Sequence, residues 1–475
     1  MPHAASWTFV ALALIAPAKA ADAQASRGAL ASGHYAVTDV TVIPMTRDSV
    51  IRDATVVVRD GRIAEVGAAR NVRVPPGARR IDGRGKYLLP GLADMHAHLY
   101  SDGDTPDSLA KYELGVMVAN GVTATRFMIG TREHFGLRRE IESGRIVGPQ
   151  LWLASPQFTG KEDVNSRVVT TPEDARTAVK EMVELGYDFI KLTLFISPPV
   201  YDAIVSEAKA QGIRVVGHVD PEVGVARALA AGQQIEHLDN YLESVLADSA
   251  PMKESVSDRG LFRLKNWESL DYVDDAKVER IAGATARAGT FTCPTLTVFK
   301  TAFALGQSEE EVKARPDWGI MPADMRGLYL GAREKYWKNP ASEARRMRWV
   351  QVRNRLVKAI ADSGGKIMTG SDTPEWFFGY GWTLHREMES LVAAGLTPYQ
   401  ALAAATRNPA EFLRASKEWG TIEKGKRADL VLVAANPLED IRNTARIEGV
   451  SVGGRWLDNA ERERMIAAAV ERLGT

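Results

Sequence analysis

The sequence predicts an α/β protein in which a (β/α)8 TIM barrel is combined with a small β domain built from both ends of the chain. Three observations support this fold: eight strand-like segments in the middle of the chain, helical patterns between most of them, and short strand-like segments near both termini. The chain has 475 residues. Chains longer than ~250–300 residues usually divide into domains or form one large barrel with additions.

The first segment, residues 1–20, has the pattern of a signal peptide. An apolar stretch at 7–17 precedes Ala18-Lys19-Ala20, which supplies the small-x-small cleavage pattern. The residues before the apolar stretch contain no lysine or arginine, although signal peptides usually begin with a positively charged region, so a disordered start is the alternative. We expect a secreted or periplasmic protein after cleavage near Ala20. We also expect no stable membrane anchor, because no other segment has the uninterrupted apolar length of a membrane span.

Short β-branched segments come next, at 38–43, 54–59 and 62–66. Asp60-Gly61 separates the last two segments and is a strong hairpin signal. Similar segments return near the other end of the chain, at 429–433 and 450–456. The two groups together predict one β domain, formed by residues 34–87 and 412–460, and a C-terminal helix at 461–475.

The middle of the chain, residues 88–411, alternates between strand and helix patterns, which is typical of a (β/α)8 barrel. The expected strands are 91–98, 121–128, 149–155, 188–194, 214–219, 234–238, 290–297 and 366–371. Helical patterns occur at 199–211, 223–231, 276–288 and 342–363. The largest expected insertions are 239–272 and 298–340, and the second is either a lid or a structural amphipathic helix.

The composition excludes some partners. Lys plus Arg number 60 and Asp plus Glu number 60, so the formal charge is zero. A nucleic-acid partner is not expected, because such proteins need an excess of basic residues on one face. Cys293 is the single cysteine of the chain and can form no internal disulfide; its apolar surroundings predict a buried packing residue.

The sharpest local signal is the segment 89–98, LPGLADMHAH. Side chains alternate between the two faces of a strand, so Asp94, His96 and His98 project to one side. Two imidazoles on one face can hold a single metal ion, and the alternative is a pair of incidental histidines. His218 and His237 also end predicted strands, at the edge of the sheet where barrel active sites lie. Nitrogen ligands of this kind suit zinc and neighbouring divalent metals.

Lys191 and Asp372 complete the set of candidate residues. Lys191 lies inside an apolar strand, and burial lowers the pKa of a lysine. A neutral buried amine can react with carbon dioxide to give a carbamate, which is able to bridge two cations; a core lysine paired with an acid is the alternative. Asp372 ends the last strand, where a carboxylate could contact a metal and carry a proton, although the sequence GSDT is also common in turns.

These residues resemble the amidohydrolase superfamily of binuclear metal-dependent hydrolases. The matching motifs occur in order and with the family's spacing: PGLADMHAH, FIKL, VVGH, IEH, MTGSDTP, GWTLHR, LAAATRNP and GKRADLVLV. The resemblance covers nearly the whole chain after the signal peptide. It implies a distorted (β/α)8 barrel with a two-part β-sandwich, in agreement with the elements expected above.

Residue by residue, the resemblance implies two divalent metal ions, with zinc the first candidate. His96 and His98 would bind the more buried ion together with Asp372, His218 and His237 would bind the more exposed ion, and carboxylated Lys191 would bridge both. A hydroxide between the ions would attack the substrate carbonyl. Asp372 would accept the proton and return it to the leaving nitrogen.

The closest branch contains imidazolonepropionase-like proteins and bacterial Xaa-Pro dipeptidases. Imidazolonepropionase itself is disfavoured, because it uses one metal and lacks the lysine bridge. The expected function is therefore hydrolysis of a linear amide or a dipeptide, of the Xaa-Pro dipeptidase or N-acyl amino acid amidohydrolase kind. The alternatives are a cyclic amide or lactone hydrolase and a non-catalytic scaffold or binding protein. The partner is expected to be a small-molecule amide or peptide, and a homo-oligomer is left open.

Substrate contacts are predicted less sharply, at Tyr100, Arg126, Tyr241 and His385. Tyr100 shares strand parity with the two histidines before it and could line the pocket, or it could be an aromatic residue at the rim. Arg126 could bind a substrate carboxylate through its fork of N–H groups, with an internal salt bridge as the alternative. His385 lies on an expected helix, and a structural role is favoured over a substrate contact.

Overall fold

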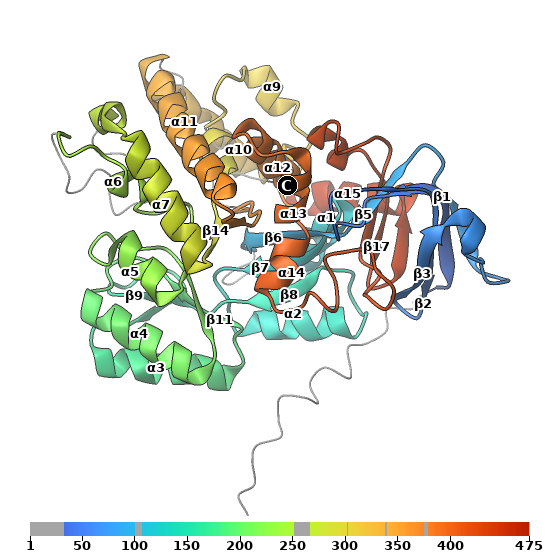
Figure 1. Cartoon of the computed structure of the whole chain (residues 1–475), viewed down its shortest axis with the longest axis horizontal. Helices are drawn as coiled ribbons and strands as arrows, with labels where there is room; N and C mark the ends of the chain where they lie inside the picture. The colour runs from blue at the N-terminus through green and yellow to red at the C-terminus, as the bar shows by residue number, and fades with distance from the viewer. Residues whose placement is uncertain are drawn as a thin grey trace, which may run out of the picture.

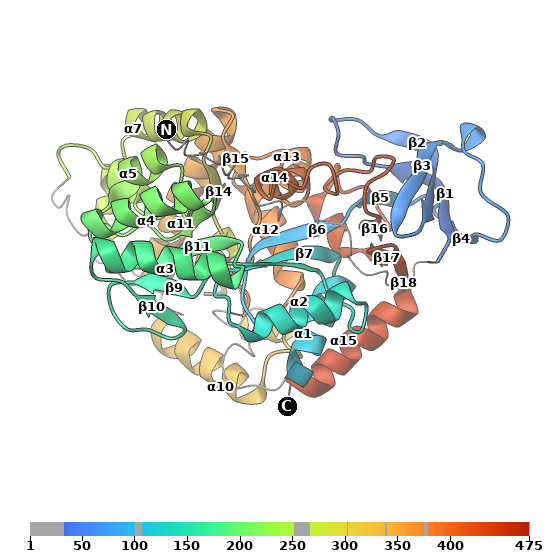
Figure 2. The same cartoon turned by 90° about the horizontal axis from the view of Figure 1, so that it is seen from below.

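The computed structural model of the protein describes residues 33–99, 107–250, 267–301, 303–337, 340–374 and 379–474. The predicted signal peptide and Tyr100 lie outside these residues. Figures 1 and 2 show the strands of the middle of the chain with helices around them, and a separate group of strands built from the two ends of the chain.

All eight strands expected in the middle of the chain are present and run parallel to their neighbours. They are β6 (Leu92–Ala97), β7 (Val122–Phe127), β8 (Gln150–Leu153), β11 (Phe189–Leu192), β12 (Arg214–Gly217), β13 (Gln234–Glu236), β14 (Phe291–Cys293) and β15 (Lys366–Ile367). Two short strands were not expected, β9 (Gln157–Thr159) and β10 (Ser166–Val168). β15 is shorter than predicted, because the chain turns away from it and reaches a positive φ of 57° at Asp372.

These strands form two sheets, β6-β7-β8 and β10-β9-β11-β12-β13-β14-β15. Isolated parallel bridges join Ala154 to Phe189 and Ala97 to Thr373, so that strands of the two sheets meet at both junctions. The α/β class and its parallel sheet are therefore as predicted. Closure into a complete barrel stays a prediction.

Helices follow most of the parallel strands, as expected for this class. Their bounds are α1 (Asp107–Ala119), α2 (Glu133–Glu142), α3 (Pro172–Leu185), α4 (Pro198–Gln211), α5 (Gly224–Ala231), α6 (Tyr241–Ser244), α7 (Asp275–Ala288), α8 (Leu296–Lys300), α9 (Glu309–Lys313), α10 (Ala323–Ala332), α11 (Pro340–Asp362), α12 (Trp382–Ala393), α13 (Pro398–Ala404), α14 (Arg407–Phe412) and α15 (Asn459–Leu473). Short helical turns are η2 (Ala69–Asn71), η3 (Trp267–Tyr272), η4 (Arg333–Trp337) and η6 (Ile441–Ala445).

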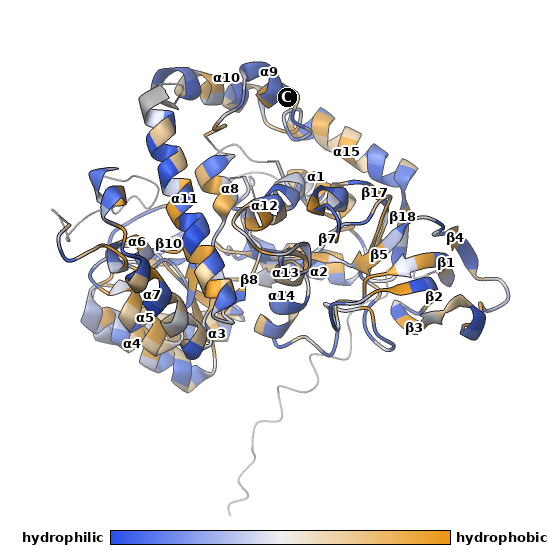
Figure 3. Ribbon diagram, turned by 45° about the horizontal axis from the view of Figure 1, so that its top comes forward, coloured by the Kyte–Doolittle hydropathy of each residue, from blue (hydrophilic) through white to orange (hydrophobic). Residues whose placement is uncertain are grey.

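The helix boundaries follow from local chemistry. The Thr171 side chain caps α3 by accepting from the backbone N–H of Asp174, and Gly186 ends the helix in the left-handed region. Along α7, Val278, Ala282 and Thr285 are buried at helical spacing, so one face packs inward. Figure 3 shows the same mixture of hydrophilic and hydrophobic residues along α7 and α11. Among the helices that the structure describes, none combines the length and the apolar character needed to cross a bilayer.

Both ends of the chain contribute to one eight-stranded sheet, with the order β18-β17-β16-β5-β1-β2-β3 and with β4 paired to β1. The strands are β1 (Tyr35–Val42), β2 (Ile51–Arg59), β3 (Arg62–Ala68), β4 (Arg79–Asp82), β5 (Tyr87–Pro90), β16 (Leu430–Val433), β17 (Ile447–Val452) and β18 (Arg455–Asp458). Figure 1 shows the N-terminal strands beside β17. The two halves meet where β5 pairs with both β1 and β16. A division of this sheet into two stacked halves stays a prediction.

The expected strand at 450–456 is instead a hairpin. Val452 of β17 pairs with Arg455 of β18, and the two residues between them are Gly453 and Gly454. Both glycines have positive φ, at 56° and 84°. This conformation matches the tight turns that connect antiparallel strands, which explains why the pattern of one strand was interrupted.

The insertion predicted at 298–340 contains α9, α10 and η4. It is tied to the segment before α12, because the buried carboxylate of Asp317 accepts from the backbone N–H of Gly379 at 2.9 Å and pairs with Arg315 at 2.7 Å. The contact between Asp317 and Gly379 favours the structural interpretation of this insertion over a freely moving lid. Cys293 is fully buried, as predicted.

Candidate metal centre

Six of the residues predicted to form the site lie at the carboxyl ends of parallel strands. His96 and His98 are at the end of β6, Lys191 is in β11, and His218, His237 and Asp372 follow β12, β13 and β15. All six are buried. Because neighbouring strands of these sheets are parallel, their carboxyl ends meet at one edge, and this brings together side chains that are far apart in sequence.

The tightest group consists of His96, His98 and Asp372. One ligand atom from each lies within 4.8 Å of the others. Oδ1 of Asp372 is 3.1 Å from Nε2 of His96 and 3.2 Å from Nε2 of His98. Nδ1 of His98 is buried and has no hydrogen-bond partner among the described residues. This donor set of imidazole nitrogens and one carboxylate fits a divalent cation such as zinc.

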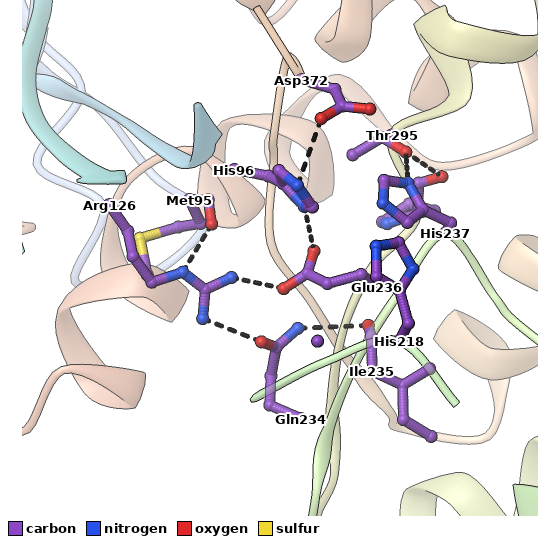
Figure 4. Close-up of polar contacts among 12 residues, drawn as sticks. Met95, His96, Arg126, His218, Gln234, Ile235, Glu236, His237, Thr295 and Asp372 are labelled. Atoms are coloured by element: carbon purple, nitrogen blue, oxygen red, sulfur yellow. Dashed lines mark hydrogen bonds and ion pairs between the residues drawn. The ribbon is translucent and has the colours of Figure 1, made fainter. Parts of the chain in front are cut away.

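The four histidines form a continuous series of rings. The ring centroids are 5.3 Å apart for His98 and His96, 4.7 Å for His96 and His237, and 4.9 Å for His237 and His218. Figure 4 shows His96, His218, His237 and Asp372 gathered around one space. The structure therefore connects the tight group to the second pair of predicted ligands.

Each of three histidines has an acceptor on Nδ1. Glu236 is 2.7 Å from Nδ1 of His96, Asp239 is 2.9 Å from Nδ1 of His218, and the Thr295 hydroxyl is 2.6 Å from Nδ1 of His237. An acceptor on Nδ1 keeps the proton there and leaves the lone pair on Nε2, which is the usual arrangement of a metal-ligating histidine. Burial holds the pKa of both His218 and His237 well below 6.5, so both rings are neutral.

Lys191 is fully enclosed among these groups. Burial lowers its pKa to about 8, although Glu236 and Asp372 act in the opposite direction. About a tenth of this amine is therefore uncharged at pH 7, far more than for an ordinary lysine. The stem of Lys191 packs against Gly217, where an added Cβ would lie 2.9 Å from Cδ of the lysine and 2.3 Å from the carbonyl oxygen of Leu192. The absence of a side chain at Gly217 makes room for the lysine.

Asp94 holds the loop that carries Asp372. Its carboxylate accepts from the backbone N–H of Ser371 at 2.9 Å and from the Ser371 hydroxyl at 2.5 Å. Burial raises the pKa of Asp94 to about 6. The histidines, led by His96, outweigh the effect of burial on Asp372 and keep its pKa well below the usual range. Asp372 is therefore a carboxylate, held in position and able to act as a ligand or a base.

A buried network lies below His96. Glu236 contacts His96 through Oε2 and Arg126 through Oε1, and the latter distance is 2.5 Å. Burial opposes ionisation of Glu236, but Arg126 and His96 outweigh it and hold the pKa of Glu236 well below the usual range. Arg126 also donates to the Gln234 side chain and to the carbonyl oxygen of Met95. Figure 4 shows the whole network.

These contacts correct the prediction that Arg126 binds substrate. The guanidinium is fully buried, and each of its three nitrogens donates to the protein. The alternative, an internal salt bridge, is what the structure contains. Burying a guanidinium is costly unless it is paired, and this group is paired inside the protein and has no surface that a substrate could reach.

Two further predicted substrate contacts also lie in the protein interior. The hydroxyl of Tyr241 is 2.8 Å from the Thr285 hydroxyl, and the side chain is fully buried between α6 and α7. His385 contacts the Thr444 hydroxyl through Nδ1 and the carbonyl oxygen of Asn120 through Nε2. Both residues therefore have structural roles, which was the favoured interpretation for His385, and the tentative substrate contact at Tyr241 is corrected. Tyr100 lies outside the described residues.

Comparison with known proteins agrees with this arrangement. The model of the amidohydrolase family matches residues 87–457, and the chain belongs to this family. An imidazolonepropionase from Mycolicibacterium smegmatis is 43% identical over 82 residues, which is 16% of this chain and 20% of that protein. An adenine deaminase from Rubrobacter xylanophilus is 24% identical over 90% of this chain and 58% of that protein. The chain thus spans less than two thirds of these curated relatives.

Two solved structures share the fold. A bottromycin amidohydrolase has a TM-score of 0.72 and 24% identity, and the alignment covers 93% of this chain and 91% of that one. A Xaa-Pro dipeptidase with bound methionine in its active site has a TM-score of 0.63 and 21% identity, and the alignment covers 90% of this chain and all (100%) of that one. At these identities the likeness extends to the fold alone.

Sequence reasoning missed several residues of the site, among them Glu236, Asp239 and Thr295. Glu236 directly precedes His237, and strict alternation in a strand would put the two on opposite faces. The backbone instead enters the left-handed region at His237, with a φ of 56°, so both side chains contact His96. The available signal was the presence of three polar residues, Gln234, Glu236 and His237, in and directly after a predicted strand.

Proposed function

We propose that this protein is a metal-dependent hydrolase of carbon–nitrogen bonds that cleaves a linear amide or a dipeptide. The observation that supports this most strongly is the buried group of His96, His98 and Asp372, whose ligand atoms lie within 4.8 Å of one another at the carboxyl ends of parallel strands. Family membership over residues 87–457 supports the reaction class.

The proposed ligand sets are those predicted from the sequence. His96, His98 and Asp372 would hold one divalent ion, His218 and His237 would hold the second, and carboxylated Lys191 would bridge them. Neutral imidazoles and a buried lysine with a pKa of about 8 support this proposal. Zinc suits the nitrogen-rich donor set. When bound, such an ion pair supplies a hydroxide near neutral pH and polarises a carbonyl group.

Asp372 is the proposed proton carrier. Its Oδ1 faces Nε2 of both His96 and His98, and its backbone segment is fixed by the contact between Asp94 and Ser371. A carboxylate held at this position could accept a proton from the nucleophile and return it to a more basic group. The leaving amine of a cleaved amide is such a group, which makes Asp372 suited to protonate it.

The substrate class rests on the known proteins with this fold. The Xaa-Pro dipeptidase aligns over its entire length and supports a dipeptide substrate. A second candidate, a cyclic amide, is favoured by one specific similarity: a dihydroorotase from Anaeromyxobacter is 38% identical over 78 residues. The carbonyl groups of amides, lactams and lactones are all open to attack by the same centre, so the fold does not choose between them.

A substrate screen tests the proposal. Purified protein loaded with zinc would be given Xaa-Pro dipeptides, other dipeptides and N-acyl amino acids, in parallel with lactams and lactones of similar size. Release of a free amino acid from a linear substrate, lost in Asp372→Asn, is the expected result. Turnover of the cyclic compounds alone would support the second candidate function, hydrolysis of a cyclic amide or lactone. No turnover on either set by protein with bound metal would favour a binding or scaffold role.

We also propose that the chain is exported and cleaved near Ala20, on the pattern of residues 1–20. Intact mass of the protein purified from its native cells is the test. A chain that begins after Ala20 supports export, and retention of Met1 contradicts it.

We propose in addition that the parallel strands close into the predicted barrel. The two interstrand bridges, at Ala97 and at Ala154, support this closure.

A further inference from the structure

Arg126 is buried without being used by the proposed reaction. It lies in β7 and has no exposed surface, yet each of its nitrogens meets an acceptor from another strand. Nε donates to the carbonyl oxygen of Met95 at 2.6 Å, Nη1 to Oε1 of Gln234 at 2.8 Å, and Nη2 to Oε1 of Glu236 at 2.5 Å. Burying a guanidinium costs free energy unless the group is well paired. A role of Arg126 in the metal centre would explain why a charged residue is kept at this position.

The contact from Glu236 to His96 supplies the reason. Oε1 of Glu236 faces the cation of Arg126 and Oε2 lies 2.7 Å from Nδ1 of His96. An arginine is always protonated, and a carboxylate beside it can only accept hydrogen bonds. Nδ1 of His96 therefore donates to Glu236, and with a metal ion bound the ligating lone pair would be the one on Nε2. That atom lies 3.1 Å from Asp372, inside the tight group of ligands.

Arg126 also fixes the backbone at His96. Met95, whose carbonyl oxygen accepts from Nε of Arg126, directly precedes His96 in β6. One guanidinium thus controls both the strand that carries His96 and the carboxylate that orients its ring (Figure 4). The Phe189 and Phe412 rings lie 5.6 Å and 5.4 Å from the guanidinium carbon and close the network from below.

A different interpretation would make this region a second metal site, because His96, Glu236 and Cys293 also have ligand atoms within 4.8 Å of one another. The charges argue against it. Any cation there would lie beside Arg126, which already occupies one oxygen of Glu236 at 2.5 Å. Removing a partner from a buried ion pair is costly, so a metal could not displace this guanidinium cheaply.

We propose that Arg126, Glu236 and Gln234 are positioning residues that fix the tautomer and the orientation of His96 for metal binding. This inference rests on the metal centre of the proposed function and is independent of the substrate class. Partners that orient a metal-ligating histidine typically contribute 10–100-fold to metal affinity. The effect is expected at one of the two ions only, the one held by His96.

The test is equilibrium metal binding by the metal-stripped full-length protein, measured with zinc in competition with a chromogenic chelator and with cobalt by visible absorption. Glu236→Gln and Arg126→Gln are each expected to weaken one metal equivalent by about 10–100-fold and to leave the other unchanged. The cobalt spectrum of the weakened site should also change. Arg126→Lys keeps the charge but cannot make three contacts at once, so it should not restore the wild-type affinity.

Two comparisons sharpen this test. Because Arg126 and Glu236 act on His96 through one network, the double variant should lose less affinity than the sum of the losses in the two single variants. The control is Glu113→Gln, which changes another fully buried carboxylate. It accepts from the Tyr380 hydroxyl at 2.7 Å, and among the described residues it makes no hydrogen bond or ion pair with a proposed ligand. It should bind both equivalents like the wild type, even if the protein is less stable.

The outcomes distinguish a failure of the positioning role from a failure of the proposed metal centre. Two metal equivalents in the wild type with unchanged affinity and spectrum in Glu236→Gln and Arg126→Gln would overturn the positioning role. A wild-type protein that takes up no metal would instead overturn the proposed centre itself. If both single variants fail to fold, Gln234→Met removes the contact to Nη1 of Arg126 together with the hydrogen bond to the carbonyl oxygen of Ile235. A smaller loss at the same equivalent is expected, and no loss would contradict the proposal.

Discussion

Gly217→Ala tests whether the lysine at the centre of the site needs the space beside it. An added Cβ would lie 2.3 Å from the carbonyl oxygen of Leu192 and 2.9 Å from Cδ of Lys191, at a backbone φ of 117°. The strained backbone costs about 1–3 kcal/mol and overpacking about 1–3 kcal/mol more, so the expected loss of stability is about 2–6 kcal/mol. Because the nearest atom belongs to the backbone, β11 and β12 must separate and Lys191 must move.

Gly212→Ala is the matched control. Gly212 ends α4 just before the same strand, also has a positive φ, at 73°, and has no atom within 4 Å of an added Cβ. It should lose only the backbone component, about 1–2 kcal/mol. The assay is urea unfolding of both variants together with metal content per protomer. The reasoning fails if Gly217→Ala binds as much metal as Gly212→Ala and unfolds at the same urea concentration.

Three further predictions follow from the same contacts. Asp372→Asn should lower turnover by about 10²–10⁴-fold while metal stays bound; wild-type turnover in a substrate assay would show that Asp372 carries no proton. Tyr241→Phe removes the hydrogen bond to Thr285 and should cost about 1 kcal/mol of stability without changing KM. A raised KM would show that Tyr241 contacts the substrate after all. Burial lowers the pKa of His385 from 6.5 to about 4. Between pH 6.5 and pH 4 this histidine is therefore protonated in the unfolded chain but not in the folded chain, so the stability of the fold decreases as the pH falls through this range. His385→Gln should remove about 2 kcal/mol of the stability loss between pH 7 and pH 5, measured by urea unfolding at both values; an identical loss in wild type and variant would mean that His385 is already protonated or exposed.

The parallel strands and the six proposed ligands could be predicted because their signals are local. A strand in a parallel sheet is a short apolar run, and its carboxyl end is the edge where such sites form, so several histidines at equivalent ends are informative together although one alone is not. His218, Lys191 and His237 follow this rule. The resemblance to a family then supplied the order in which the motifs should occur.

The residues that support the ligands could not be predicted, because their roles depend on contacts between distant strands and on local departures from regular backbone. From the sequence, Arg126 could be a substrate ligand or one half of an ion pair. Only the structure shows that its partner is Glu236, which is 110 residues away in sequence. His237 and Asp372 are displaced from strand parity by positive φ values of 56° and 57°. Alternation along a strand gives no warning of either turn.

Metal content per protomer decides whether the protein holds a pair of ions. Elemental analysis of protein purified without chelators should find two equivalents of zinc or a similar divalent ion, and alanine at His96 and at His218 should each remove one. Two equivalents that depend on both histidines would support the bridged pair around Lys191. A protein that contains no metal, and takes up none when zinc is supplied, would contradict the account.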